Sequence, residues 1–387
     1  MTRLGDVLAD IKPGFASRDN LEEGVFQFRM HNFTRESALD LTKRRRVNAT
    51  VKQISTQSVS PGDVLFNATN SPELVGKSAL IGTLDEPAVF SNHFMRLRTD
   101  PSQLEPGYLA HFLRFQFSRG VFRAMAKAWV NQATVGRDRL EALQIPLPSL
   151  DDQRRIATIL DHADAIRIKR RQNLTHLDTL TQSIFHDMFA GHENEMVPLA
   201  DLAAVTSGIT KGRRTAEPTS PTPYLAVSNV QAGRLKMDVV KEIDATTAEI
   251  DRYALKDGDL VLTEGGDPDK LGRGTVWRSE LPLCLHQNHV FRVRSHSVEP
   301  DYLTAFMASR SARSYFLRAA KQTTGIASIN MTQLKALPVP VPSGSDQSTF
   351  VERMNGVEGQ RVAMKRSVAA NDELFASLQS RAFRGEL

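Results

Sequence analysis

The sequence predicts an α+β protein in which one mixed α/β domain and one long helix each occur twice along 387 residues. Three observations predict this fold. Short motifs recur at one long offset, a tract of alternating prolines ends each domain, and a long segment with helical periodicity follows each tract. The offset is too large for a solenoid repeat, so it indicates duplication of a whole domain with its connector.

The repeat rests on matched motifs, and the positions of Tyr108 and Tyr302 give its offset, 194. The motifs that share this offset are Tyr108-Leu109 and Tyr302-Leu303, Leu140-x-Ala142-Leu143 and Leu334-x-Ala336-Leu337, Pro146-x-Pro148-Ser149 and Pro340-x-Pro342-Ser343, Asp152-Gln153 and Asp346-Gln347, Asp178-x-Leu180 and Asp372-x-Leu374, and Phe189-x-Gly191 and Phe383-x-Gly385. The offset drifts to 196 at His93 and His289. The two domains have therefore diverged more than the junctions and the helices.

The first predicted domain covers residues 1–150 and mixes strands, loops and helix. Short apolar runs such as 64–66 and 94–97 follow turn residues, which is the punctuation expected of strands. Apolar residues recur at helical spacing over 107–127, so that segment is predicted to be helical.

The first predicted long helix covers residues 151–192. The alternating prolines of 145–150 favour an extended segment, and Asp151 or Asp152 is expected to cap the helix that follows. Neither proline nor glycine occurs again before Gly191, which allows a helix of roughly 58 Å at 1.5 Å per residue. Its residues expected to face a partner helix are Ile156, Leu160, Ala163, Leu174, Leu177, Leu180 and Ile184.

The second half repeats the plan, with a domain over 193–342 and a long helix within 343–387, from about Asp346 to Phe383. Seam positions from Met354 to Ala382 alternate in steps of three and four, the spacing of a coiled coil. Gly356 and Gly359 are expected to start or kink the helix. The residues expected at the helix pair are Val357, Met364, Val368, Asn371, Leu374 and Leu378.

Each long helix has one apolar face and needs a partner in water. Because the helices leave equivalent domains, we expect them to pair as an antiparallel coiled coil with pseudo-two-fold symmetry. Polar seam residues such as Arg361 and Asn371 are expected to fix the register. The open alternative is that the long helices serve only for dimerisation.

The composition is that of a soluble globular protein, with 41% hydrophobic and 24% charged residues. The sequence has no apolar run of membrane-spanning length, no signal-peptide core at its start, and a single cysteine, Cys284, all of which favour the cytoplasm. A net charge of +5 fits an ordinary surface as well as nucleic-acid binding. Basic clusters at 43–46, 169–171 and 211–214 favour nucleic acid.

Motifs of catalysis are missing from the sequence. The glycine-rich segment 263–274 matches neither a phosphate-binding loop nor a dinucleotide fingerprint, and the acidic and histidine residues lack metal-ligand spacing. A Ser-His-Asp arrangement stays open, although no nucleophile elbow supports it. We therefore predict no catalytic residue, no metal site and no cofactor bound by this chain.

Amide and basic side chains in the loops suggest binding instead, because Asn and Gln can pair with adenine and Arg with guanine in the major groove. Asn92-His93 and Asn288-His289 occupy matching places before strands. A structural hydrogen bond and a DNA contact are equally favoured for these pairs. The candidate DNA-binding residues are Arg29, Asn32, Lys43, Arg44, Arg45, Asn67, Asn70, Asn92 and His93 in the first half, and Lys211, Arg213, Arg214, Asn229, Lys270, Arg273, Gln287, Asn288 and His289 in the second.

Several of these segments resemble the specificity subunit of Type I restriction–modification enzymes. The resemblance is carried by the junction 145–156, the helix ends 177–183 and 382–387, the segments 28–32 and 224–230, and the stretches 260–274 and 286–291. The second junction, 343–349, departs from the pattern because it lacks the basic pair after Gln347.

The resemblance implies two target-recognition domains, each reading one half of a bipartite double-stranded DNA target, with the paired helices setting the gap. It also implies docking of two modification (adenine methyltransferase) subunits, joined by two restriction subunits. S-adenosylmethionine, ATP and magnesium would belong to those partners, and this chain would not be catalytic. Two other classes stay open: a coiled-coil adaptor without DNA binding, and an enzyme with duplicated catalytic domains.

Overall fold

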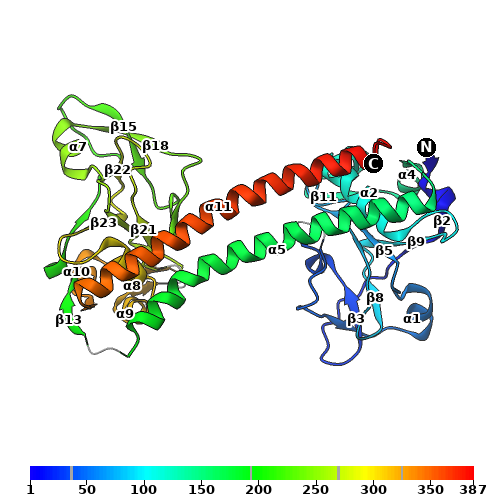
Figure 1. The fold of residues 1–387 in the computed structure, drawn as a ribbon, viewed down its shortest axis with the longest axis horizontal. Helices are drawn as coiled ribbons and strands as arrows, with labels where there is room; N and C mark the ends of the chain where they lie inside the picture. The colour runs from blue at the N-terminus through cyan, green and yellow to red at the C-terminus, as the bar shows by residue number, and fades with distance from the viewer. Residues whose placement is uncertain (35–37, 192–193, 268–270, 324–325) are drawn as a thin grey trace. The chain divides into compact units, whose positions relative to one another are not determined.

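The computed structural model describes residues 1–34, 38–191, 194–267, 271–323 and 326–387. The chain divides into two compact units (Figure 1). Unit 1 consists of Met1–Arg171 and Arg366–Leu387, and unit 2 consists of Gln172–Lys365. Each unit thus combines one domain, the start of the helix that follows it, and the end of the other helix.

Unit 1 contains a four-stranded antiparallel sheet and a three-stranded sheet in which β3 and β8 run parallel. The larger sheet has the order β2(Leu8–Pro13)-β9(Phe94–Thr99)-β5(Val64–Asn67)-β7(Ser78–Leu80), and the second has the order β4(Arg46–Val47)-β3(Val25–Phe28)-β8(Ala88–Phe90). Two smaller sheets are β10(Lys127–Trp129)-β11(Gln132–Thr134)-β6(Thr69–Asn70) and β1(Thr2–Arg3)-β12(Gln144–Ile145).

The helices of unit 1 are η1(Leu4–Val7), η2(Met30–Asn32), α1(Val51–Gln57), α2(Pro106–Ser118), α3(Val121–Met125) and α4(Arg137–Glu141). Among them, α2 packs against the larger sheet and shares a core with the long helices. The helix predicted over 107–127 is two helices, because Gly120 adopts a positive φ of 72° between them. One hydrophobic core joins α2 to the long helices, and another lies under β3 and β8, farther from them (Figure 1).

Unit 2 contains the same kinds of sheet. The larger has the order β14(Ala203–Ser207)-β23(Val290–Ser295)-β19(Leu260–Thr263)-β21(Gly274–Val276), and the second has the order β18(Lys241–Ala245)-β15(Ser220–Leu225)-β22(Leu285–His286). The smaller sheets are β20(Gly265–Gly266)-β25(Ile326–Ser328)-β24(Lys321–Thr323), β13(Glu195–Pro198)-β26(Pro338–Val341) and β16(Val230–Gln231)-β17(Arg234–Leu235). The short helices are α6(Leu199–Leu202), α7(Thr247–Tyr253), α8(Pro300–Met307), α9(Arg310–Ala319) and α10(Met331–Lys335).

The two units share one topology. β2-β9-β5-β7 corresponds to β14-β23-β19-β21, and β4-β3-β8 corresponds to β18-β15-β22, each with its parallel pair. The two remaining sheets of unit 1 also have counterparts, and the β16-β17 pair corresponds in position to an isolated antiparallel bridge between Phe33 and Leu39. The mixed α/β content predicted for each domain is confirmed.

The long helices are α5(Leu150–Phe189) and α11(Gly344–Ala382). Their caps correct the prediction that Asp151 or Asp152 begins the first helix. Ser149 Oγ accepts a hydrogen bond from Asp152 N at 3.2 Å, and Ser343 Oγ accepts one from Asp346 N at the same distance. α11 also runs unbroken through Gly356 and Gly359, and there is open space around both positions.

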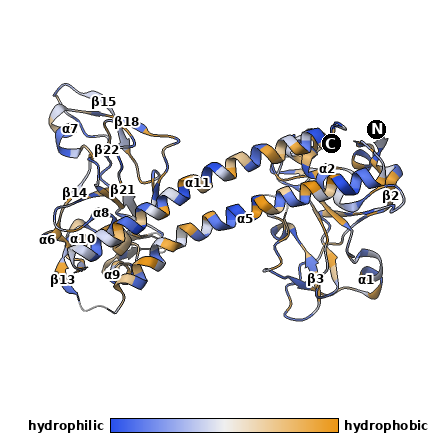
Figure 2. Ribbon diagram, viewed as in Figure 1, coloured by the Kyte–Doolittle hydropathy of each residue, from blue (hydrophilic) through white to orange (hydrophobic). Residues whose placement is uncertain are grey.

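The buried and half-buried positions of α11 follow the predicted seam from Met354 to Ala382. Leu374 lies outside this seam, with 55% of its surface exposed, because the sheltered positions step from Asn371 to Phe375. Leu180 of α5 is exposed as well, because the sheltered positions there include Leu177 and Thr181 but not Leu180. Hydrophilic and hydrophobic residues alternate along both helices, as Figure 2 shows.

Within unit 1 the two helices run antiparallel. Near the start of α5, Arg155 Nη2 donates to the carbonyl oxygen of Leu387 at 3.1 Å. Further along α5, Arg167 Nε donates to Asp372 Oδ1 at 2.8 Å. As the residue number rises along α5, the number of its partner therefore falls.

Candidate nucleic-acid interface

Each unit carries a candidate binding edge at one corner of its larger sheet. In unit 1 this hairpin edge consists of β6, the β10–β11 hairpin and the turn 91–93. β11 pairs with β6 through Ala133 and Asn70, and the backbone N–H of Thr69 donates to the carbonyl of His93 at 3.2 Å. Backbone hydrogen bonds therefore fix the hairpin, the strand and the turn relative to one another.

Five of the predicted residues gather at or near the hairpin edge of unit 1. Asn67 Nδ2 donates to the His93 carbonyl at 3.2 Å, and Asn70 Nδ2 donates to Asn67 Oδ1 at 2.6 Å. Burial and the nearby Arg29 guanidinium lower the pKa of His93, so its ring is neutral at pH 7. Asn92 is exposed and can reach a ligand, whereas Asn67 is buried.

The hairpin edge of unit 2 consists of β20, the β24–β25 strands and the turn 287–289. The backbone N–H of Glu264 donates to the His289 carbonyl at 3.0 Å, as Thr69 does to His93 in unit 1. His289 Nδ1 also lies 2.6 Å from Glu264 Oε2, yet its ring is exposed. The backbones of these turns are structural, while the exposed Asn92 and His289 side chains face solvent.

Asn32 and Asn229 have a structural role, which corrects their assignment as DNA contacts. Asn32 is fully buried; its Oδ1 accepts from Arg29 N, and its Nδ2 donates to two backbone carbonyls. Asn229 makes the same three bonds, with Ala226 N as the donor to its Oδ1. These amides hold loop backbones together and have no free group for a base.

The basic run 43–46 is mostly neutralised inside unit 1. Arg44 lies 2.6 Å from Glu86 and 2.9 Å from Asp85, and Arg46 lies 2.5 Å from Glu86. The hydrogen bond from Arg46 outweighs desolvation and lowers the pKa of Glu86. Arg45 donates to backbone carbonyls of the loop around Asp19. Lys43 is exposed beside these arginines.

The second basic cluster behaves similarly. Arg213 pairs with Glu249 of α7, and its hydrogen bond lowers the pKa of Glu249 to about 2. Lys211 and Arg214 are exposed on either side of it. Lys270 lies outside the described residues.

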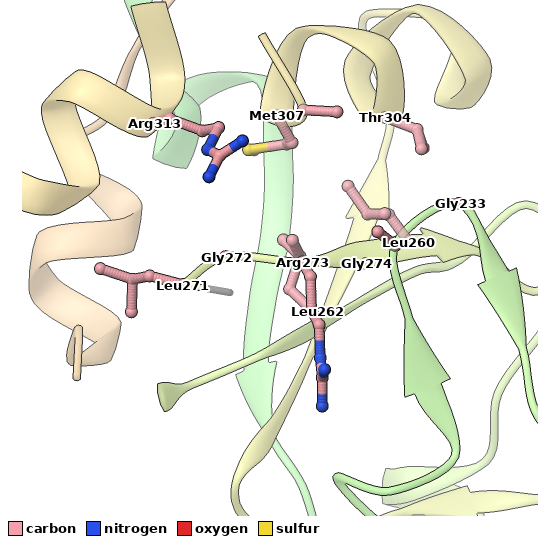
Figure 3. A pocket seen from close by; sticks show the side chains of 12 residues that line it. Gly233, Leu260, Leu262, Leu271, Gly272, Arg273, Gly274, Thr304, Met307 and Arg313 are labelled. Atoms are coloured by element: carbon pink, nitrogen blue, oxygen red, sulfur yellow. The ribbon is translucent and has the colours of Figure 1, made fainter. Parts of the chain in front are cut away.

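Arg273 and Gln287 lie near the hairpin edge of unit 2. The Arg273 carbonyl accepts from Thr263 N at 3.0 Å, directly before Glu264, and its side chain is half-buried. A small pocket lies beside this strand (Figure 3), lined by Leu260, Leu262, Met307 and other residues, and the Arg273 guanidinium points away from it. The half-buried Gln287 donates its backbone N–H to the Leu225 carbonyl.

Two buried glutamines escaped the sequence-based site prediction. Gln153 accepts from Glu105 N and donates to the Pro148 carbonyl at 3.0 Å. Gln347 accepts from Glu299 N and donates to the Pro342 carbonyl at 3.0 Å. Their place in the repeated Asp-Gln motif was the available signal. They tie each proline junction to the domain before it.

Among the described residues, no group of three or more His, Cys, Asp or Glu side chains could hold a metal ion. Within the same part of the chain, no helix is long and apolar enough to cross a membrane.

The chain therefore combines two units of the same sheet order with two long helices, and each unit has one hairpin edge that could bind a ligand. Residues 3–177 match the family model described as the Type I restriction modification DNA specificity domain. The chain is 24% identical over 356 residues to the type I restriction enzyme EcoKI specificity subunit of Escherichia coli K12, covering 86% of this chain and 76% of that protein. It is 32% identical over 163 residues to a putative type I restriction enzyme MjaX specificity subunit of Methanocaldococcus jannaschii. That match spans 42% of this chain and 38% of the archaeal protein.

Two solved structures share the fold. One, from a study of complex assembly and conformational transition of the type I R-M system, gives a TM-score of 0.59 at 17% identity, covering 100% of this chain and 97% of that chain. The S subunit of a type I system from M. genitalium gives a TM-score of 0.53 at 14% identity, covering 98% and 95%. The resemblance found in the sequence is confirmed: the matching family model and the similar proteins are those of specificity subunits of type I restriction–modification systems.

Proposed function

We propose that each unit reads one half of a bipartite DNA target, while α5 and α11 set the distance between the halves and dock two methyltransferase subunits. The observation that carries this proposal is the repetition of one topology around two hairpin edges that differ in their exposed side chains. Two units of one topology that expose different side chains are suited to recognise two different half-sequences.

The helices support the spacing role. α5 and α11 contain 40 and 39 residues, so each is roughly 60 Å long at 1.5 Å per residue. Two half-sites one DNA turn apart are separated by about 34 Å, which such helices can span. The pairing along both helices as one antiparallel, pseudo-two-fold coiled coil is part of this proposal.

Chemistry would belong to the partners. A methyltransferase must turn its adenine out of the stack, and the partner subunits, with S-adenosylmethionine, would do this where the specificity subunit positions them. Restriction subunits with ATP and magnesium would join the same assembly. This chain would bind and orient without reacting.

Exchange of one domain tests the proposal. Residues 1–148 are replaced by the equivalent domain of another specificity subunit, and methylated adenines are mapped in host DNA. The incoming domain should keep aromatic residues where Tyr108, Phe112 and Phe115 meet Phe383, so that unit 1 still closes. Reinsertion of the original domain through the same cloning junctions is the matched control.

The expected result is a change in one half of the methylated sequence with the other half and the gap unchanged. A change in both halves would refute independent reading. An adaptor without DNA binding would leave host methylation the same with or without the gene. Sequence-dependent binding that weakens steeply with salt separates the two classes further.

A further inference from the structure

We propose that the tip of the β10–β11 hairpin, Trp129 and Val130, is a DNA contact of unit 1, with the Trp129 ring stacking on a base of the first half-target. This inference rests on the proposed function and adds a site to it. None of the residues at the tip belongs to the candidates chosen from the sequence.

The tip exposes more apolar surface than a hairpin requires. Trp129 is 68% exposed and Val130 is 98% exposed, whereas the second tryptophan, Trp277, is 1% exposed. Two-residue hairpin turns favour Asn-Gly or similar pairs, but this turn is Val130-Asn131. Leaving a tryptophan in water forgoes the free energy that its burial would supply, so a partner is expected to cover it.

The charge around the tip identifies nucleic acid as that partner. Between Glu105 and Asp138 the sequence has five cationic residues and no acidic one, and two of the five, Arg114 and Arg137, pair with Asp164 and Glu141. Arg119, Arg123 and Lys127 are all exposed. An acid-free cationic segment next to an exposed aromatic ring fits a phosphate backbone and a base, since phosphate contacts supply affinity and the ring supplies stacking.

The repeat carries the same charge pattern. Between Asp301 and Asp346 the second half also has five cationic residues and no acidic one. Lys321 at the start of β24 is the counterpart of Lys127, and Arg313 is the counterpart of Arg119. The position equivalent to Trp129 is Thr323. The cationic setting is therefore common to both units, whereas the aromatic ring belongs to unit 1.

The β10–β11 hairpin lies at the same edge as the predicted DNA-binding residues Asn70 and Asn92. β11 is hydrogen-bonded to β6, and Thr69 Oγ1 lies 3.1 Å from Thr134 Oγ1 across that pair. Thr69 N donates to His93, next to the exposed Asn92. A duplex whose base edges meet Asn92 would thus lie along the same edge as the hairpin. Apolar side chains of minor-groove binders enter base steps in a comparable way.

The test uses a labelled duplex that carries the target found by methylation mapping. Fluorescence anisotropy gives the Kd for the full chain, alone and assembled with its methyltransferase partner. We expect Trp129→Ala to weaken binding about tenfold to a hundredfold, the loss associated with one stacked base, and Trp129→Phe to restore most of it. Val239→Ala, which alters an equally exposed apolar side chain of unit 2, is the control and should change nothing.

Two further measurements separate the possible partners. Lys127→Ala should lower the slope of log Kd against log salt by about one phosphate contact. Acrylamide quenching of the accessible tryptophan should fall when the duplex is added, because Trp277 is already shielded.

The outcomes are distinct. If Trp129→Ala binds the target like the parent chain, or loses only assembly with the methyltransferase, the hairpin is not a DNA contact and the proposed function stands. If the parent chain shows no sequence-dependent binding in either form, the proposed function fails and this inference fails with it. Tighter binding of the target than of an unrelated duplex, lost in Trp129→Ala and kept in Trp129→Phe, supports both.

Discussion

In unit 1, Phe383 at the end of α11 packs against Tyr108, with the ring centroids 5.4 Å apart. In unit 2, the repeat-equivalent Phe189 at the end of α5 packs against Tyr302 at 5.0 Å. The tyrosine hydroxyls then donate to equivalent proline carbonyls, at 2.9 Å in unit 1 and 2.6 Å in unit 2. Both domains are therefore closed by the end of the helix that begins in the other half of the sequence.

Around this shared contact, unit 1 has an ionic network. Asp164 of α5 lies 3.2 Å from Arg114 of α2 and 2.7 Å from Arg167. Arg167 and Arg171 both donate to Asp372 of α11, at 2.8 Å each for the closest atoms. The carboxylates thus connect the domain helix α2 to both long helices.

In unit 2 the domain helix α8 has no charged side chain at two of these positions. The positions equivalent to His111 and Arg114 are Ala305 and Ala308. Phe350, fully buried, meets Phe185 at 5.9 Å and Phe189 at 5.6 Å. Both units thus keep the apolar closure, whereas the charged contacts from α2 to α5 have no equivalent side chains in α8. The two joints should consequently respond differently to cavities, salt and acid.

The largest expected effect is a cavity in the joint of unit 2. Phe350→Ala should lower the free energy of unfolding of unit 2 by about 3–5 kcal/mol, because it removes a fully buried ring from an aromatic cluster. Urea denaturation followed by Trp277 emission reports on this unit. The matched variant Ile156→Ala in unit 1 should cost about 2–3 kcal/mol and leave the Trp277 transition in place. Equal shifts of that transition in both variants would contradict separate joints.

The next effect removes the carboxylate that links the helices of unit 1. Asp372→Ala should lower the stability of unit 1 by about 1–2 kcal/mol, a value reduced for solvent because the side chain is 37% exposed. Hydrogen exchange of α2 peptides measures it, and the loss should shrink in 1 M salt. Glu358→Ala, which removes an exposed carboxylate paired with the half-buried Arg361 in unit 2, should cost less than about 0.5 kcal/mol. A comparable loss from both variants would show that the network adds nothing.

A smaller effect is expected from the helix caps, which have the same geometry in both units. Ser149→Ala and Ser343→Ala should each destabilise their helix by about 1 kcal/mol, because each removes a side-chain cap with the same geometry. Hydrogen exchange of the first turns of α5 and α11 gives the two losses. Ser55→Ala, in the exposed helix α1, is a control that should leave both long helices unchanged. Unequal losses would mean that the junctions have diverged after all.

The sequence predicted the repeated parts well because they are local and periodic. The seam of α11 and the repeated plan follow from spacing alone, and the structure has sheltered positions along that seam and matching sheet orders in its two units. The break at Gly120 was not predicted, because apolar periodicity continues on both sides of it. Gly356 and Gly359 were expected to disturb α11, but buried seam residues such as Val357 support the helix around them.

The candidate site was harder to predict because residue type does not reveal burial. Asn32 and Asn229 have the composition of base readers, yet their partners are backbone groups distant in sequence. Arg44 was a plausible phosphate contact until the fold placed Glu86 beside it. The exposed hairpin of unit 1 was not predicted as a site, because a lone tryptophan between apolar neighbours resembles a core strand in sequence.

The smallest expected effect concerns acid, and it follows from Asp372 in the joint of unit 1. Burial of this carboxylate opposes its ionisation, but the hydrogen bonds from Arg167 and Arg171 outweigh burial and hold its pKa below the usual range. A folded-state pKa below the unfolded value stabilises the protein above the unfolded pKa, near 4, and that stability disappears as the pH falls through the folded pKa. Unit 1 should therefore lose up to about 1 kcal/mol below about pH 4 from this group, after allowance for solvent screening. Asp372→Asn, which cannot titrate, should flatten that part of the pH profile measured by hydrogen exchange of α2, while unit 2 keeps its own profile. An unchanged slope in the variant would assign the acid response of unit 1 to other carboxylates, one of which is Asp161, whose pKa the His111 hydrogen bond lowers.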